Sequence, residues 1–218
     1  MKRIHSLAAL ILLAASPFAL ATSNFSFTGN FVQDDDKPSF KFTLNSPGVV
    51  TIRTYGFAGG TNSAGTVIPA GGFDPTIQFF DSTGLLVGLS LDGTCGQVGT
   101  DPVSGACWDS YYSQPLPAGT YTVYLTEYDN QANGPFLSDG FHQDGQGNFT
   151  GPEFTGAPGS FILVDTSQRT SAWALDIVGV DQANEPGLAG IPALGTAGLL
   201  MLAVLLGAVA FFSLRTVA

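Results

Sequence analysis

Three consecutive aspartates form the densest group of potential metal ligands in the sequence. Asp34, Asp35 and Asp36 lie in a polar stretch between two segments of alternating apolar residues. Carboxylate oxygens are preferred ligands of Ca²⁺, and a divalent cation would relieve the repulsion between adjacent negative charges. Further loop carboxylates are available to complete the coordination, at Asp74, Asp129, Asp139 and Asp144. The spacing does not match an EF-hand loop. A Ca²⁺ site and a solvated acidic turn are therefore both open.

Three aromatic residues beside Cys107 form a second candidate site. Trp108, Tyr111 and Tyr112 lie in a long polar stretch. Exposed together, their rings would make a stacking platform for the sugars of an exopolysaccharide. Large aromatic side chains also supply much of the apolar area of protein cores. The sequence leaves both roles open, ligand binding and capping of the core.

Catalytic chemistry has little support among the remaining residues. His142 is the only histidine after residue 21, so a Ser-His-Asp or Cys-His arrangement would have to use it. The sequence contains no GxSxG, HExxH or P-loop motif. The surrounding polar, glycine-rich stretch predicts a solvated histidine. We expect no enzymatic activity, and a hydrolase that uses His142 is the less favoured alternative.

Cys95 and Cys107 are the only cysteines of the chain. An isolated pair in an exported protein most often forms a disulfide. A metal or redox role would call for a nearby histidine or a CxxC spacing, and the sequence has neither. We predict a structural disulfide that closes a short loop.

The two ends of the chain predict export and membrane targeting. Residues 1–21 have a basic start, an apolar run and a small-x-small cleavage site, as in a secretory signal peptide. Residues 191–218 include an apolar stretch long enough for a transmembrane helix, followed by Arg215. The part between them, residues 22–188, carries four basic and seventeen acidic side chains, a formal charge of −13. This charge disfavours nucleic acid as a partner.

Short alternating segments predict an all-β domain at residues 22–180. Period-two runs rich in aromatic and β-branched residues are typical of half-buried antiparallel strands. We expect eight of them, at 24–31, 40–44, 49–55, 76–81, 85–89, 120–128, 161–165 and 172–180. With turn residues between the runs, they predict a single jelly-roll-like antiparallel β-sandwich. Residues 56–75, 92–115 and 129–160 are expected to be loops, and residues 181–190 a linker.

The C-terminal segment resembles the IPTL-CTERM class of bacterial sorting signals, which is related to PEP-CTERM. Ile191, Pro192, Ala193 and Leu194 stand before the apolar stretch, and Arg215 follows it. Ala193 takes the place of the usual threonine. The resemblance implies an exosortase-type sorting peptidase as a partner and anchoring in the membrane at least transiently, with cleavage and retention of the segment both open.

The central domain resembles exported bacterial proteins of unassigned role that are related to bacterial pre-peptidase C-terminal (PPC) domains. The resemblance rests on FSFTGNFVQDDD (25–36), FKFTL (40–44), residues 55–84, LPAGTYTVYLTEYDN (116–130), GQGNFTG (145–151) and RTSAWALDI (169–177). It implies a jelly-roll sandwich without known catalytic activity. It also implies a Ca²⁺ role for the aspartate triplet.

Together these features predict a non-enzymatic protein of the cell surface or extracellular matrix of a Gram-negative bacterium. The sandwich would be stabilised by Ca²⁺ and sorted to the envelope by its C-terminal segment. A carbohydrate-binding or adhesion module is the alternative.

Overall fold

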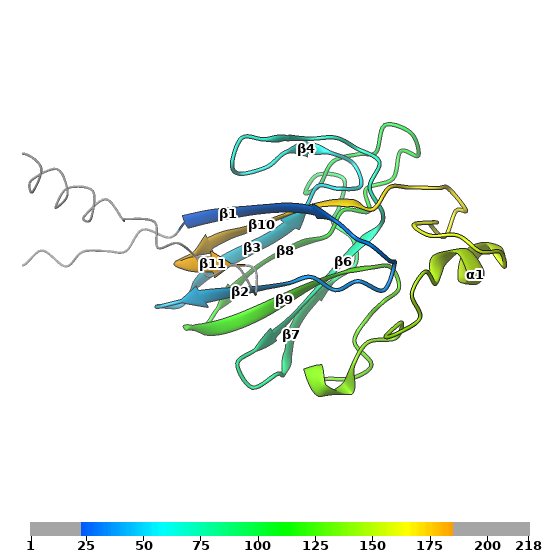
Figure 1. Cartoon of the computed structure of the whole chain (residues 1–218). Helices are drawn as coiled ribbons and strands as arrows, with labels where there is room; N and C mark the ends of the chain where they lie inside the picture. Colours follow the sequence, from blue (N-terminus) through cyan, green and yellow to red (C-terminus); the bar gives the residue numbers. More distant parts are fainter. Residues whose placement is uncertain (1–22, 185–218) are drawn as a thin grey trace, which may run out of the picture.

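A computed structural model describes residues 23–184, which form two facing antiparallel β-sheets (Figure 1). The first sheet has the order β1 (Ser23–Asn30), β10 (Ala172–Val180), β3 (Gly48–Thr54) and β8 (Tyr111–Leu116). The second has the order β11 (Gln182–Asn184), β2 (Ser39–Leu44), β9 (Gly119–Glu127), β6 (Pro75–Asp81) and β7 (Leu86–Ser90). A hairpin of β4 (Gly60–Thr61) and β5 (Val67–Ile68), a 3₁₀ turn η1 (Leu137–Asp139) and a short helix α1 (Thr150–Thr155) complete the described elements.

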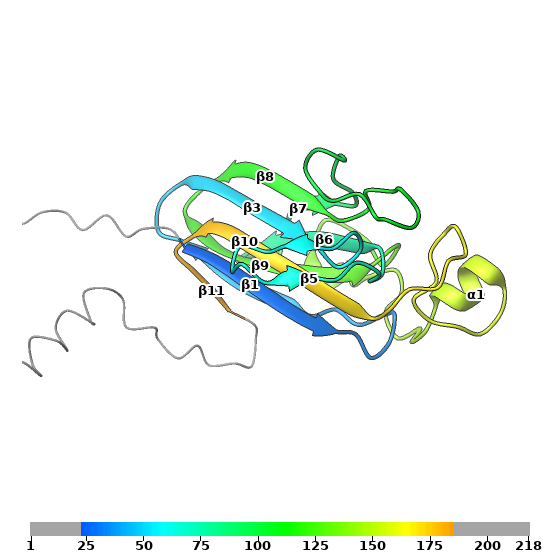
Figure 2. The ribbon, with the colours of Figure 1, turned by 90° about the horizontal axis from the view of Figure 1, so that it is seen from above.

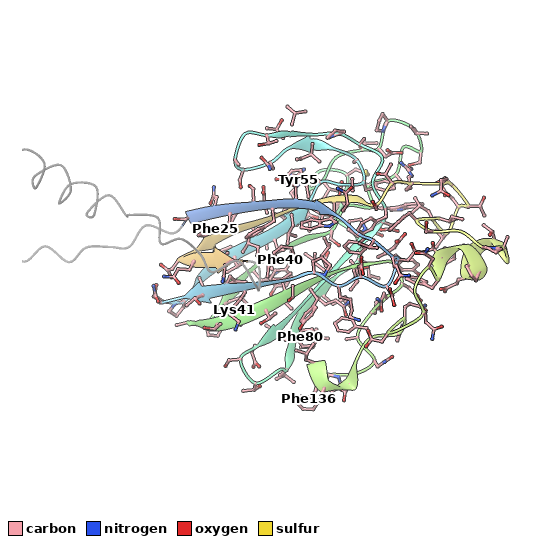
Figure 3. All side chains as sticks on the ribbon, viewed as in Figure 1. Phe25, Phe40, Lys41, Tyr55, Phe80 and Phe136 are labelled. Atoms are coloured by element: carbon pink, nitrogen blue, oxygen red, sulfur yellow. A yellow bond between two sulfur atoms is a disulfide. The ribbon has the colours of Figure 1, made fainter. Side chains whose placement is uncertain are left out.

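The core lies between the sheets because successive side chains of a strand point to opposite faces. On β2, Phe40, Phe42 and Leu44 are buried, whereas Lys41 is exposed. Figure 3 shows Phe40 inside the sandwich. Aromatic pairs join the two layers, with the rings of Phe40 and Trp173 centred 5.6 Å apart in an edge-on arrangement. Full burial of each such side chain contributes about 1.5–3 kcal/mol to stability.

The outer face of the second sheet is also covered. Thr76, Gln78 and Phe80 alternate with the core positions of β6, yet all three are buried. The segment that follows β9 lies over them, and the amide of Gln78 holds it in place. Gln78 Nε2 donates to the carbonyl of Asn130 at 3.1 Å, and Gln78 Oε1 accepts from the Ala132 amide at 2.6 Å. The burial of the Gln78 amide on this face is tolerated because its donor and its acceptor are both hydrogen-bonded.

The β4–β5 hairpin covers the outer side of the first sheet (Figures 1 and 2). Its anchor is Asp176 on β10, which is 1 % exposed. One carboxylate oxygen accepts from Ser26 Oγ at 2.6 Å, and the other accepts from the Ser63 amide at 2.7 Å. Burial, together with the neighbouring Asp176 carboxylate, raises the pKa of Tyr55 to about 12.

The all-β, antiparallel prediction is confirmed, and one predicted strand is wrong. Residues 161–165 form no strand; they contain an isolated bridge between Ile162 and Gln168. Phe161 has a φ of 52°, and the Leu163 amide bonds back to Ser167 at 3.0 Å, so the backbone turns there. Strand β8 instead takes up the last residues of the predicted loop 92–115 and ends one residue beyond it. It is an edge strand, where Pro115 is tolerated.

The predicted loops and linker are partly structured. Residues 56–75 contain the β4–β5 hairpin, and residues 129–160 contain η1 and α1. Residues 182–184 of the predicted linker form β11, which pairs with β2. Between residues 23 and 184 no helix is long and apolar enough to cross a membrane. The predicted signal peptide (1–21) and sorting segment (191–218) lie outside the described residues.

Candidate functional site

The long connections of the sandwich gather at one end, which we call the loop-bearing end. It comprises residues 31–38, 55–74, 91–110 and most of 128–171, which follow or precede strands at that edge of both sheets. Figure 1 shows α1 at this end, while β1 starts at the opposite end. Loops carried by a rigid scaffold are the usual place for binding residues. Most candidate site residues predicted within the described range lie at this end or on the adjoining part of β8. Asp139 lies instead in η1, where the Leu137 amide bonds to the Gly84 carbonyl in the β6–β7 turn, and His142 lies in the segment that covers the second sheet.

Asp34 is an internal anchor of the loop-bearing end. Its side chain is completely buried. One carboxylate oxygen accepts from the Thr150 amide at 3.0 Å and from the Thr150 hydroxyl, and the other accepts from the Phe161 amide at 2.9 Å. The carboxylate thereby ties the β1–β2 connection to α1 and to the segment after it.

The other two aspartates of the triplet bind different donors. Asp35 accepts from the Gly147 amide at 2.9 Å. Asp36 accepts from the amides of Val32 and Gln33 and closes its own turn. Residues 23–184 contain no group of three or more His, Cys, Asp or Glu side chains placed to hold a metal ion. The structure therefore does not bring Asp34, Asp35 and Asp36 together as one ligand set, because consecutive residues of a turn point in different directions.

The aromatic candidates are separated as well. Tyr111 and Tyr112 are neighbours on β8, so they point to opposite faces of the sheet. Tyr112 packs on the core residue Phe79, with ring centres 4.7 Å apart. Trp108 packs on the buried Phe57 at 5.2 Å. This arrangement favours the core-capping role for Trp108 and Tyr112 over a shared stacking platform.

His142 is exposed in the segment that covers the second sheet. Its backbone amide donates to the carbonyl of Gln131 at 2.8 Å. Nearby, Lys37 forms an ion pair with Asp144 and lies over the ring of Phe141. These contacts fix the loop, and none of the described cysteines is free to act as a nucleophile.

A polar pocket of about 350 Å³ opens beside α1. Its lining is rich in side-chain amides and comprises Gln143, Gln146, Asn148, Phe149, Pro152 and Glu153. The amide of Gln143 donates to Asp129 at 3.2 Å and to Glu153 at 3.1 Å, which holds both carboxylates in place. Of the two, Glu153 lines the pocket. Burial and the nearby Asp129 charge raise the pKa of Glu153. The sequence prediction missed this pocket, because its residues lie in a polar stretch without a motif.

A second missed residue is Glu127, the last residue of β9. It is 1 % exposed, and neither carboxylate oxygen has a hydrogen-bond partner among the described residues. The sequence did hold a signal for it. Tyr121, Val123 and Leu125 occupy the inward positions of the same strand, so the period of two places Glu127 on the core face.

The remaining loops are held by covalent and ionic links. Cys95 and Cys107 form the predicted disulfide, with Cα atoms 5.2 Å apart. Asp101, inside that loop, makes a buried two-point ion pair with Arg169 at 3.2 and 3.0 Å. Burial would raise the pKa of Asp101, but the hydrogen bonds from Arg169 and Ser104 outweigh it and hold the pKa well below its usual range.

No protein-family model matches the chain, and a search of curated proteins finds no match to it. The resemblances to PPC-related proteins and to IPTL-CTERM signals therefore stay hypotheses. The resemblance to IPTL-CTERM signals rests on residues outside the described part of the chain, namely Ile191, Pro192, Ala193, Leu194 and Arg215.

Proposed function

We propose that this protein is a non-enzymatic, exported β-sandwich of the bacterial envelope or extracellular matrix, and that its loop-bearing end binds a neutral polysaccharide. The observation that carries the proposal is the amide-lined pocket beside α1. Helix α1, which contributes Pro152 and Glu153 to the pocket, lies at the end of the sandwich away from the start of β1 (Figure 1). A chain held at that opposite end would present the pocket outward.

The chemistry of the pocket supports a polyhydroxylated ligand. Side-chain amides both donate and accept hydrogen bonds, as neighbouring sugar hydroxyls require. Gln146 is exposed at the pocket, and the Pro152 ring offers an apolar surface to the carbon face of a sugar. The Glu153 carboxylate in the lining and the Asp129 carboxylate bonded to Gln143, on a strongly acidic domain, disfavour anionic ligands.

Export and a jelly-roll relationship belong to the same proposal. A disulfide persists in oxidising compartments, which supports export. The chain passes between the two sheets at most of its connections, which supports a jelly-roll arrangement of PPC type. Sorting through residues 191–218 by an exosortase-type peptidase would account for surface display. Cell fractionation with the intact mass of the mature protein tests this route.

Polysaccharide binding is tested with the full chain on a glycan array and by affinity electrophoresis. We expect binding that weakens at least tenfold in Gln146→Ala and Glu153→Gln, the two variants at the open part of the pocket. Gln114→Ala is the matched control, because Gln114 is an exposed glutamine on β8. An array without binding, or equal binding by all variants, would refute the proposal. Loss in Trp108→Ala alone would favour the aromatic alternative.

A further inference from the structure

Glu127 is a buried carboxylate without a partner, at the inner edge of the loop-bearing end. It follows three core residues of β9 at the inward positions of that strand. Its pair on β6 is Pro75, which places it at the mouth of the interior between the sheets. At 1 % exposure, water cannot solvate its charge from outside.

Two other buried carboxylates of the loop-bearing end, Asp34 and Asp109, are satisfied by protein donors. Asp34 accepts three hydrogen bonds, as described above. Asp109 accepts from the Thr54 hydroxyl and from the amides of Phe57 and Ala58. Both oxygens of Glu127, by contrast, lack a partner among residues 23–184. Burial of an unpaired carboxylate costs several kcal/mol, so a protein keeps one only where something compensates for it.

The surroundings of Glu127 add negative charge. Asp74 precedes its strand neighbour Pro75, and the Asp74 carbonyl accepts from the Tyr128 amide at 3.0 Å. The Asp74 side chain is itself only 8 % exposed. Burial, and then the charges of Asp34 and Asp74, raise the pKa of Glu127 well above its usual value. The two charged groups that raise the pKa of this carboxyl are thus carboxylates, whereas Asp74 also feels the positive charge of Arg169.

We propose that a divalent cation, most suitably Ca²⁺, binds between Glu127 and Asp74 at the loop-bearing end, with Asp34 as a further negative charge beside it. The donors are oxygens, and neither histidine nor cysteine takes part, which disfavours Zn²⁺. Because the described side chains include no group of three acidic ligands, main-chain carbonyls and water must complete the coordination. Ca²⁺ accepts six to eight such oxygens in flexible geometry, whereas Mg²⁺ requires a stricter octahedron.

This site differs from the one predicted from sequence. Asp35 and Asp36 take no part in it, because the Asp35 carboxylate accepts from the Gly147 amide and the Asp36 carboxylate closes its own turn. The inference also stands independently of polysaccharide binding, because Glu127 points into the core rather than into the pocket beside α1. The rival explanation is a Glu127 that stays protonated and neutral, which would need no ion.

The test uses the full chain, freed of metal with EDTA. We expect calorimetric titration with CaCl₂ to show one strong site per chain, and Ca²⁺ at 100 times its Kd to raise the folded-to-unfolded ratio about 100-fold. Glu127→Gln should lose the heat of binding and the shift in Tm. Asp36→Asn, the matched control from the sequence-predicted site, should keep both. MgCl₂ should give a much smaller shift.

Terbium luminescence provides a second readout that does not depend on stability. Tb³⁺ replaces Ca²⁺ at oxygen sites, and Tyr128 stands next to Glu127 as a sensitiser. The luminescence should disappear on addition of Ca²⁺ and be weakened in Asp74→Asn, a variant that keeps Glu127. The proposal is overturned if the wild-type chain binds no Ca²⁺ at millimolar concentration. It is equally overturned if Glu127→Gln binds as the wild type does, or if Asp36→Asn alone abolishes binding.

Discussion

Replacing Arg169 with methionine should destabilise the protein by about 3–5 kcal/mol at neutral pH, the usual cost of removing one partner of a buried ion pair. The Asp101 side chain is fully buried and that of Arg169 is 6 % exposed, so water cannot replace the lost guanidinium. Asp101 would keep only its hydrogen bonds from Ser104, at 2.7 Å. The guanidinium also lies 4.6 Å above the ring of Phe57, a contact that methionine replaces only in part.

The loss of stability in Arg169→Met should change with pH in a definite direction. The pKa of Asp101 in the folded protein lies below its unfolded value of about 3.9, so its contribution is complete above that value and is lost as the pH falls through the lower folded pKa. In Arg169→Met, burial is no longer opposed by the guanidinium, and Asp101 takes up a proton at higher pH. The difference between wild type and variant should therefore be largest at neutral pH and shrink in acid.

Urea unfolding of both proteins across a pH series measures this difference. Asp165→Asn is the control, because Asp165 is an exposed carboxylate near Arg169 that accepts from the Ser167 amide at 2.9 Å. It should cost about 0.5 kcal/mol or less. A loss below about 1 kcal/mol in Arg169→Met, or a loss independent of pH, would refute the assignment of this pair as a buried link between loops.

Two further changes probe the loop-bearing end. Reduction of the Cys95–Cys107 disulfide should lower the free energy of unfolding by about 3 kcal/mol, measured by urea unfolding with and without reductant; an unchanged midpoint would contradict this. Gly72→Ala should cost about 1–3 kcal/mol, because the added Cβ would lie 2.3 Å from the carbonyl oxygen of Ala172. Gly96→Ala, whose Cβ would meet no atom within 4 Å, should leave Tm nearly unchanged, and equal shifts in the two variants would count against this account.

The sequence predicted best those strands in which buried and exposed side chains alternate regularly. β2 and β9 alternate buried and partly exposed side chains along most of their length, and both lie near the predicted bounds. β8 was missed because Ser113, Gln114 and Pro115 break the apolar pattern of an edge strand that needs little burial. Residues 161–165 are apolar for a different reason. Phe161 and Leu163 are buried as part of a turn, with the Phe161 amide fixed by Asp34.

The candidate sites were harder to predict because they depend on contacts between distant segments. The disulfide could be predicted, since only one pairing exists. Asp34 drew attention as one of three acidic neighbours, but its role depends on Thr150, which is 116 residues away. Glu127 was not predicted as a site residue, because a single glutamate at the end of a strand forms no recognisable motif. Its meaning appears only when the register of β9 and the absence of a partner are known together.

The covering of β6 on both sides has a consequence for how the sequence can vary. In most two-layer sandwiches the outward positions of a strand accept almost any polar residue. Here Thr76, Gln78 and Phe80 are as deeply enclosed as the inward residues Ile77 and Phe79. Amino-acid substitutions should therefore be limited at every position of β6. A substitution of Gln78 would require a compensating change in the segment after β9. The sequences of β6 and of the segment after β9 can therefore change only together.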